Sequence, residues 1–122
     1  MLILSIPKIL KILSAASFIL FGPLDIITTR MAIGAGAVEA NPFWTTEAVM
    51  TAEAAIFKLA FFLGISSLIF LCAISIERDR SGGFYSSIAR PLALIAAAAF
   101  TLWGAHVVIN NIIVYLWQTG MI

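Results

Sequence analysis

Charged residues are scarce in this sequence: Asp, Glu, Lys and Arg make up 11% of the 122 residues, and the formal net charge is +1. So weak a positive charge, with no basic stripe, excludes a nucleic-acid partner, because such a surface needs clustered Lys and Arg. A single cysteine, Cys72, excludes an intrachain disulfide. With only one histidine as well, the chain cannot build a closed zinc site from its own residues. We therefore expect no resident metal.

Apolar residues are abundant instead, at 62% of the chain with a mean hydropathy of +1.10. A soluble domain of this size could not bury that much apolar surface, so a lipid bilayer must cover much of it. Three apolar segments, residues 12–34, 54–76 and 88–117, are each long enough to cross a hydrocarbon core of about 30 Å at about 1.5 Å per residue. The sequence predicts an all-α integral membrane bundle of three transmembrane helices, forming one domain over residues 1–122.

The first segment has the outline of a secretory signal, because lysines precede an apolar run and Ala35-Gly36-Ala37 follows it. Asp25 and Arg30 lie between that run and Ala37, which is the wrong spacing for a cleavage site. We expect this segment to stay as a membrane anchor.

The connections indicate an orientation. Asn41-Pro42 reads as an N-cap followed by proline at the first helical position, so a helix should begin near Pro42. Cytoplasmic connections are enriched in Lys and Arg, which places the N-terminus inside, the C-terminus outside and the first connection outside. The protein would then lie in a cytoplasmic membrane. The residues behind this prediction are Lys8, Lys11, Arg78, Arg80 and Arg90 on the inner side and Glu39, Glu47 and Glu53 on the outer side.

Polar residues at one depth of the three segments predict an intramembrane cluster. Counting inward from the outer ends places them roughly 10 to 16 Å deep. Charges at such depth normally face the bundle interior and pair with each other. We expect Asp25 to pair with Lys58, with threonines one turn later completing the hydrogen bonds. The predicted cluster is Asp25, Thr28, Thr29, Lys58, His106 and Asn110.

Pro23 precedes this cluster in the first segment. Proline lacks the N–H that the Ile19 carbonyl would normally accept, so it should bend the helix just before Asp25. For the cluster itself two interpretations stay open. An Asp–Lys pair with polar neighbours can simply fix the packing of a small bundle, or it can serve transport, ligand binding or proton transfer.

His106 has its own alternatives: an axial haem ligand, a hydrogen-bond donor to a quinone, or a buried imidazole bonded to a neighbouring helix. A haem held by two histidines would need a second subunit, since the chain has one His. For Asn110 and Asn111 the simplest expectation is hydrogen bonding between helices.

A family resemblance rests on three short motifs: Leu24-Asp25-Ile26-Ile27-Thr28-Thr29, then Glu39-Ala40-Asn41-Pro42, then Lys58-Leu59. These resemble a widespread family of small prokaryotic membrane proteins, of three or four helices, with Asp-x-x-x-Thr, Glu-x-Asn-Pro and Lys motifs. The likeness covers about residues 20–60, and Asn110-Asn111 fits it more loosely. No established activity comes with the family. The resemblance implies that Asp25, Thr29, Lys58 and a loop motif of Glu39, Asn41 and Pro42 belong to one recurring site.

For function, the sequence favours a non-enzymatic accessory or assembly subunit of a larger membrane complex, because it contains no soluble domain, nucleophile arrangement or metal motif. Its partners would be the lipid bilayer and other membrane subunits or further copies of itself. Three alternatives stay open: a haem- or quinone-associated anchor of a respiratory complex near His106, an oligomeric ion or small-molecule carrier using Asp25 and Lys58, and a membrane-derived filament subunit.

Overall fold

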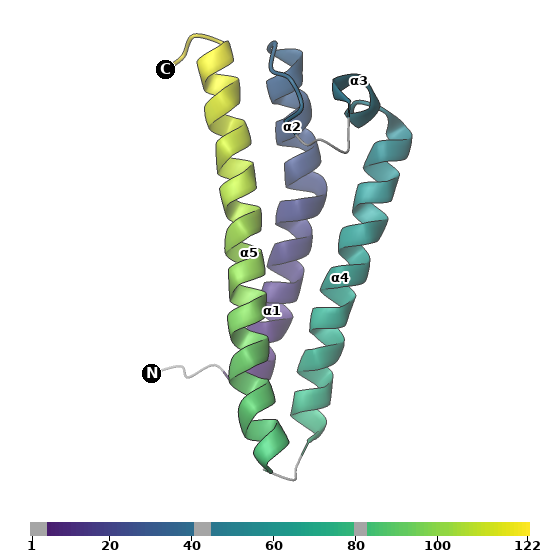
Figure 1. The fold of residues 1–122 in the computed structure, drawn as a ribbon, viewed down its shortest axis with the longest axis vertical. Coiled ribbons are helices and arrows are strands. Elements are labelled where there is room, and N and C mark those ends of the chain that lie inside the picture. The colour runs from purple at the N-terminus through teal and green to yellow at the C-terminus, as the bar shows by residue number, and fades with distance from the viewer. Residues whose placement is uncertain (1–4, 41–44, 80–82) are drawn as a thin grey trace.

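The computed structural model describes residues 5–40, 45–79 and 83–122 and contains three long helical spans (Figure 1). The first runs over Ile6–Gly34 and consists of α1 (Ile6–Ile19), a π-helical turn η1 (Leu20–Leu24) and α2 (Asp25–Gly34). The others are α4 (Ala52–Arg78) and α5 (Phe84–Gln118), with a short α3 (Thr46–Val49) before α4. By length and hydropathy all three spans can cross a membrane, so the predicted three-span helical architecture is confirmed.

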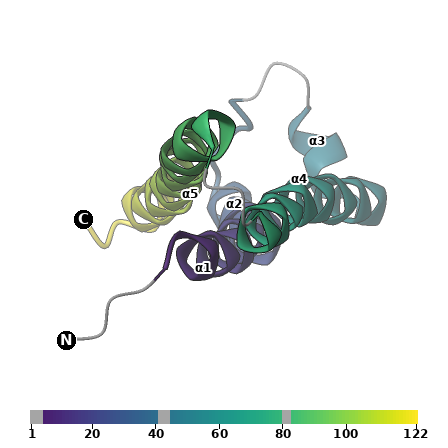
Figure 2. The same ribbon diagram turned by 90° about the horizontal axis from the view of Figure 1, so that it is seen from below.

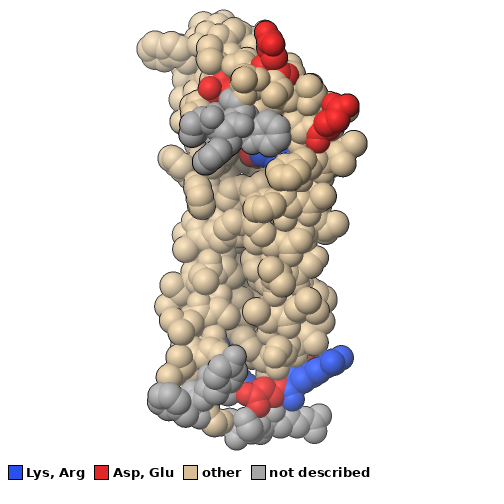
Figure 3. Space-filling view, turned by 45° about the vertical axis from the view of Figure 1, so that its right-hand side comes forward, with Lys and Arg blue, Asp and Glu red and all other residues tan. Residues whose placement is uncertain are grey.

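On the face of the molecule shown in Figure 3, charged side chains lie toward the two ends of the bundle and none is visible over its middle. Acidic side chains predominate toward the end that carries α3, where some basic atoms are also visible, and basic and acidic side chains lie together at the opposite end. This distribution fits a hydrocarbon layer around the middle of the bundle. We call the end with α3 the upper end and the opposite end the lower end.

Pro23 is accommodated by a π-helical turn in the first span. It lies inside η1, where the Asp25 N–H reaches the Leu20 carbonyl five residues earlier. In a π-helical turn each carbonyl accepts from the N–H five residues later in the chain. The Ile19 carbonyl therefore does not need the N–H that Pro23 lacks, and the helix continues. The extra residue in this turn also sets the direction in which Asp25, the first residue of α2, points.

The end of the first span has a physical cause. Gly36 has a φ of +113°, a left-handed conformation that favours glycine. Its N–H donates to the Ile33 carbonyl, and the Ala37 N–H donates to the Ala32 carbonyl. These two bonds form a Schellman cap, which satisfies the last carbonyls of α2.

The expected helix start near Pro42 lies outside the described residues. The chain forms α3, breaks at Met50 and Thr51, and begins α4 with Thr51 as N-cap. The Thr51 hydroxyl accepts from the Ala54 N–H at 3.2 Å, and its carbonyl accepts from the Arg30 guanidinium at 2.7 Å. Arg30 thereby ties the end of the first span to the beginning of α4.

The three spans pack closely in the lower half, whereas in the upper half α2 and α5 stay in contact and α4 separates from them. The first span contacts both other helices extensively, whereas α4 and α5 contact each other little (Figures 1 and 2). Leu10, Ala73, Ile76 and Ala97 form the lower core. Above them is a serine layer, in which Ser14 donates to the Ser66 carbonyl at 2.7 Å and Ser17 lies 3.3 Å from the Ser66 hydroxyl. From there upward, α4 leans away from α5.

Candidate functional site

An aromatic layer forms the floor of the upper half. The Phe21 ring stacks on the rings of Phe62 and Phe100, with distances of 4.7 and 4.5 Å between ring centroids. It is perpendicular to the Trp103 ring, with 6.0 Å between centroids. Gly104 allows this approach, since a Cβ built there would come within 2.9 Å of the Phe21 ring. One ring of the first span is therefore held between rings of the other two spans, immediately below Asp25.

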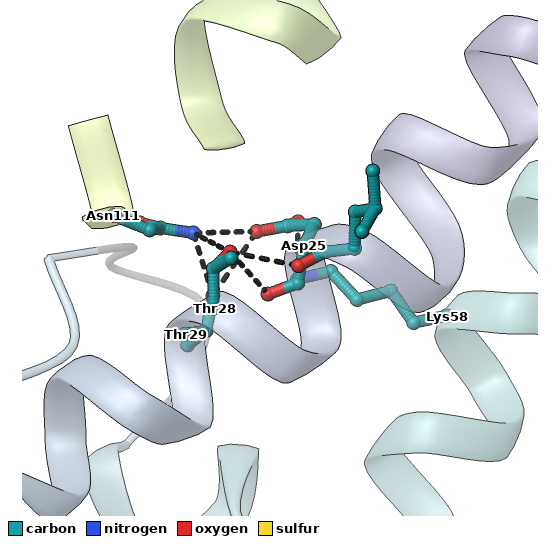
Figure 4. A network of polar contacts seen from close by, with 6 residues as sticks. Asp25, Thr28, Thr29, Lys58 and Asn111 are labelled. Carbon is teal, nitrogen blue, oxygen red and sulfur yellow. Dashed lines mark hydrogen bonds and ion pairs between the residues drawn. The ribbon is translucent and has the colours of Figure 1, made fainter. Parts of the chain in front are cut away.

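Asp25 is the centre of a polar network that joins all three spans (Figure 4). Its Oδ2 lies 2.7 Å from Lys58 Nζ of α4. Its Oδ1 accepts from the Thr29 hydroxyl at 3.0 Å and from the Asn111 amide of α5 at 2.9 Å. Lys58 and Asn111 reach the carboxylate from opposite sides. We call Asp25, Thr28, Thr29, Lys58 and Asn111 the polar centre.

The threonines complete this network. Thr28 donates to the Leu24 carbonyl at 2.7 Å, so its oxygen is free to accept from the Asn111 amide at 3.1 Å. That amide also lies 3.0 Å from the Thr29 hydroxyl. Because a carboxylate can only accept, the nitrogen of the Asn111 amide must face Asp25 and its oxygen must point the other way.

The two charged groups differ in exposure. The Asp25 side chain is 7% exposed and the Lys58 side chain 30%. An unpaired carboxylate at this depth would be costly, whereas a paired one with further donors is well tolerated. The structure therefore seals the carboxylate and leaves part of the ammonium accessible.

Lys58 borders two hollows. A water-sized void of about 40 Å³ lies on the side of α3, lined by Thr29, Glu39, Val49 and Lys58 among others. A larger cleft of about 490 Å³ lies between α4 and α5, with the polar centre at its head and the aromatic layer along its length. The polar centre is thus accessible from both the loop side and the space between the helices.

The loop motif contributes one described residue. Glu39 lines both hollows, and its backbone N–H donates to the Thr46 hydroxyl at 3.0 Å, which ties the loop to α3. Asn41 and Pro42, the other two residues of the predicted motif, lie outside the described residues.

Of the six residues predicted to form the cluster, the structure brings four together: Asp25, Thr28, Thr29 and Lys58. Including His106 and Asn110 was wrong, since both are exposed on α5. Depth along the helix was estimated, but rotation about its axis was not, and consecutive residues lie about 100° apart. A haem or quinone beside His106 would therefore lie on the outer surface of α5, away from the polar centre.

Asn111 is the member that the sequence prediction missed. A signal for it exists, because Gly104 and Asn111 are seven positions apart and so lie on nearly the same face of the helix. A helical-wheel projection aligned on the small residues Ala97, Thr101 and Gly104 places Asn111 on the face toward the bundle interior and Asn110 off it.

No protein-family model, curated protein or solved structure matches this chain. The family resemblance therefore stays a prediction. Within residues 5–40, 45–79 and 83–122, no three His, Cys, Asp or Glu residues are placed to hold a metal ion. What the described site offers is hydrogen bonding and one partly accessible cation at the head of an apolar cleft.

Proposed function

We propose that this chain is a non-enzymatic accessory or assembly subunit of a larger membrane complex, and that a helix of another subunit packs on the outer face of α4. As part of this proposal, the lower end with its lysines and arginines faces the cytoplasm of a prokaryotic cell and the upper end faces outside. The small integral membrane fold is the part that the three spans establish.

One observation carries the proposal: Gly64, in the middle of α4, is not required for any close packing among the residues that the structure describes. A Cβ built at Gly64 would meet no atom within 4 Å, whereas Cβ atoms built at Gly22 and Gly104 would meet neighbours at 3.2 and 2.9 Å. Glycine inside a helix costs about 0.5–1 kcal/mol relative to alanine. At the other two positions close packing offsets that cost, and at Gly64 a partner helix would offset it.

The neighbours of Gly64 support this interpretation. Ala60 and Ser67 are also exposed, and helical periodicity places them on the same face as Gly64. Gly64 lies about 160° around the helix from Ser66, which faces the first span. Small residues spaced in this way let two transmembrane backbones approach closely.

The test is a bulky substitution with a matched control. Gly64→Leu should abolish comigration of the chain with its complex in native gels after mild extraction. Ala99→Leu, at an exposed small residue of α5, should leave comigration intact. If the native protein migrates as a monomer, or if both variants behave alike, the subunit proposal is wrong. Differently tagged copies distinguish a partner subunit from a second copy.

The alternatives receive less support from the described site. His106 is exposed on α5, so the polar centre gives no support to a haem or quinone beside it. A carrier needs a continuous polar path, and the aromatic layer of Phe21, Phe62 and Phe100 lies directly below the polar centre.

A further inference from the structure

The cleft between α4 and α5 has the dimensions and lining of a small-molecule site. Its volume of about 490 Å³ falls within the range of about 300–1,000 Å³ that is typical of ligand pockets. Such pockets are mostly apolar with a few convergent polar groups. Here the apolar part is formed by aromatic and aliphatic side chains, and the polar groups converge at one end.

The cleft opens sideways, toward lipid. Phe61 on α4 and Trp103 on α5 line it and are 53% and 62% exposed, respectively. The two helices that carry these residues diverge toward the upper end (Figure 1). A ligand that enters between them comes from the hydrocarbon layer, so it must be lipid-soluble.

The head of the cleft offers one accessible donor group. Lys58 has three N–H bonds, of which one is directed to Asp25 within the part of the chain that the structure describes. The amide nitrogen of Asn111 is engaged by Asp25 and the threonines. A ligand head with a carbonyl or hydroxyl oxygen would therefore accept from Lys58.

The charge of the polar centre selects an uncharged head. Asp25 and Lys58 compensate each other at 2.7 Å, so a further charge in this apolar setting would have no counterion. An anionic head would also lie near Glu39 at the rim of the cleft. A cationic head would lie beside the Lys58 ammonium, which the ligand must approach to hydrogen-bond.

We propose that this cleft binds a lipid-soluble molecule with an uncharged head that carries a carbonyl or hydroxyl oxygen. The head lies beside Lys58 at the polar centre, and the body lies against Trp103 and the aromatic layer. Two kinds of molecule share this chemistry: a quinone, with a flat ring, and a monoacylglycerol, with an acyl chain. The proposal is independent of the proposed subunit role, because it uses the space between α4 and α5 and not the outer face of α4.

Trp103 supplies the measurement, since it lines the cleft. The variant Trp44→Phe/Trp117→Phe keeps Trp103 as the only tryptophan. In detergent or nanodiscs, its fluorescence is titrated with decylubiquinone, with a monoacylglycerol brominated on its chain, and with brominated oleate. We expect saturable quenching by one or both neutral probes, which identifies the ring or the chain as the preferred body, and only linear, collisional quenching by oleate.

The control is the variant Trp44→Phe/Trp103→Phe, which keeps Trp117, an exposed residue near the end of α5 that does not line the cleft. It should show only collisional quenching with all three probes. If the neutral probes quench Trp103 no more than Trp117, or if oleate saturates Trp103 as well as they do, the proposal is wrong.

Two variants test the location of the ligand. Val107 lines the cleft, so Val107→Phe should fill it and weaken saturable quenching by about tenfold or more. Ile109→Phe adds the same ring on an exposed face and should not change it. Asp25→Asn/Lys58→Met removes both charges together, which leaves no lone charge to unfold the bundle. This double variant should weaken binding by a similar factor, and unchanged binding in either cleft variant contradicts the proposal.

Discussion

Two ion pairs of equal length lie at opposite ends of the bundle. Lys58 and Asp25 are 2.7 Å apart at the upper end, and Lys11 and Glu77 are 2.7 Å apart at the lower end. The upper carboxylate is nearly buried and accepts two further hydrogen bonds, whereas the side chains of the lower pair are 35% and 55% exposed. Distance is therefore a poor guide to the importance of an ion pair. The two pairs differ in the exposure of the carboxylate to water, which decides how costly that charge becomes when its partner is removed.

The largest expected effect is the loss of the Lys58 ammonium. Lys58→Met leaves the buried Asp25 carboxylate without its counterion, and we expect a loss of about 3–5 kcal/mol in the free energy of unfolding. Chemical unfolding in detergent, followed by circular dichroism, measures it. The double variant Asp25→Asn/Lys58→Met should recover much of the loss. If Lys58→Met is as stable as the parent, the Asp25–Lys58 pair contributes no more to stability than an exposed ion pair does.

The second effect separates the two asparagines of α5. Asn111→Leu removes a hydrogen bond to the Asp25 carboxylate and should cost about 1.5–3 kcal/mol, because bonds to charged groups are the stronger kind. Asn110→Leu, at an exposed position, should cost nothing or slightly stabilise the protein in detergent. The same unfolding assay compares them. Equal losses would mean that rotation of α5 about its axis differs from the one described.

Asn110 and Asn111 also show how far the sequence predicts the position of a residue in the bundle. Depth follows from about 1.5 Å per residue, and it placed Asp25 and Lys58 in one layer before any contact was known. Rotation about a helix axis needs a reference face, and the apolar residues of α5 surround the helix, so only its small residues Ala97, Thr101 and Gly104 distinguish Asn111 from Asn110. Lipid covers one face and protein the other, and both favour apolar residues.

The local backbone was predictable in kind but not in detail. Pro23 signals a disturbance of the first span, yet the formation of a π-helical turn there depends on packing around Phe21 and Gly22, which are both buried. The break before α4 has a weak signal in Thr51, a good N-cap residue, but threonine also occurs inside helices. These details set the direction of Asp25 and the start of the helix that carries Lys58.

A third prediction compares two glycines at different places in the bundle. Gly104→Ala places a methyl group 2.9 Å from the Phe21 ring and should cost about 1–3 kcal/mol through overpacking of the aromatic layer. Gly64→Ala meets open space and should leave the isolated chain unchanged or more stable. Unfolding of the purified chain tests both. Destabilisation by Gly64→Ala alone would show that the aromatic layer tolerates change better than the outer face of α4.

The smallest effect belongs to the lower ion pair. Glu77→Gln removes the partner of Lys11, but both groups keep access to water and the Lys11 ammonium also lies 5.9 Å from the centre of the Phe70 ring. Exposed pairs contribute little and are screened by salt, so the variant should unfold close to the parent, and any difference should shrink as salt is raised. The matched comparison is Lys58→Met. Its loss of stability should persist at high salt because the Asp25 carboxylate is buried. A large, salt-independent loss of stability in Glu77→Gln would mean that the lower ion pair is as well shielded from solvent as the upper one.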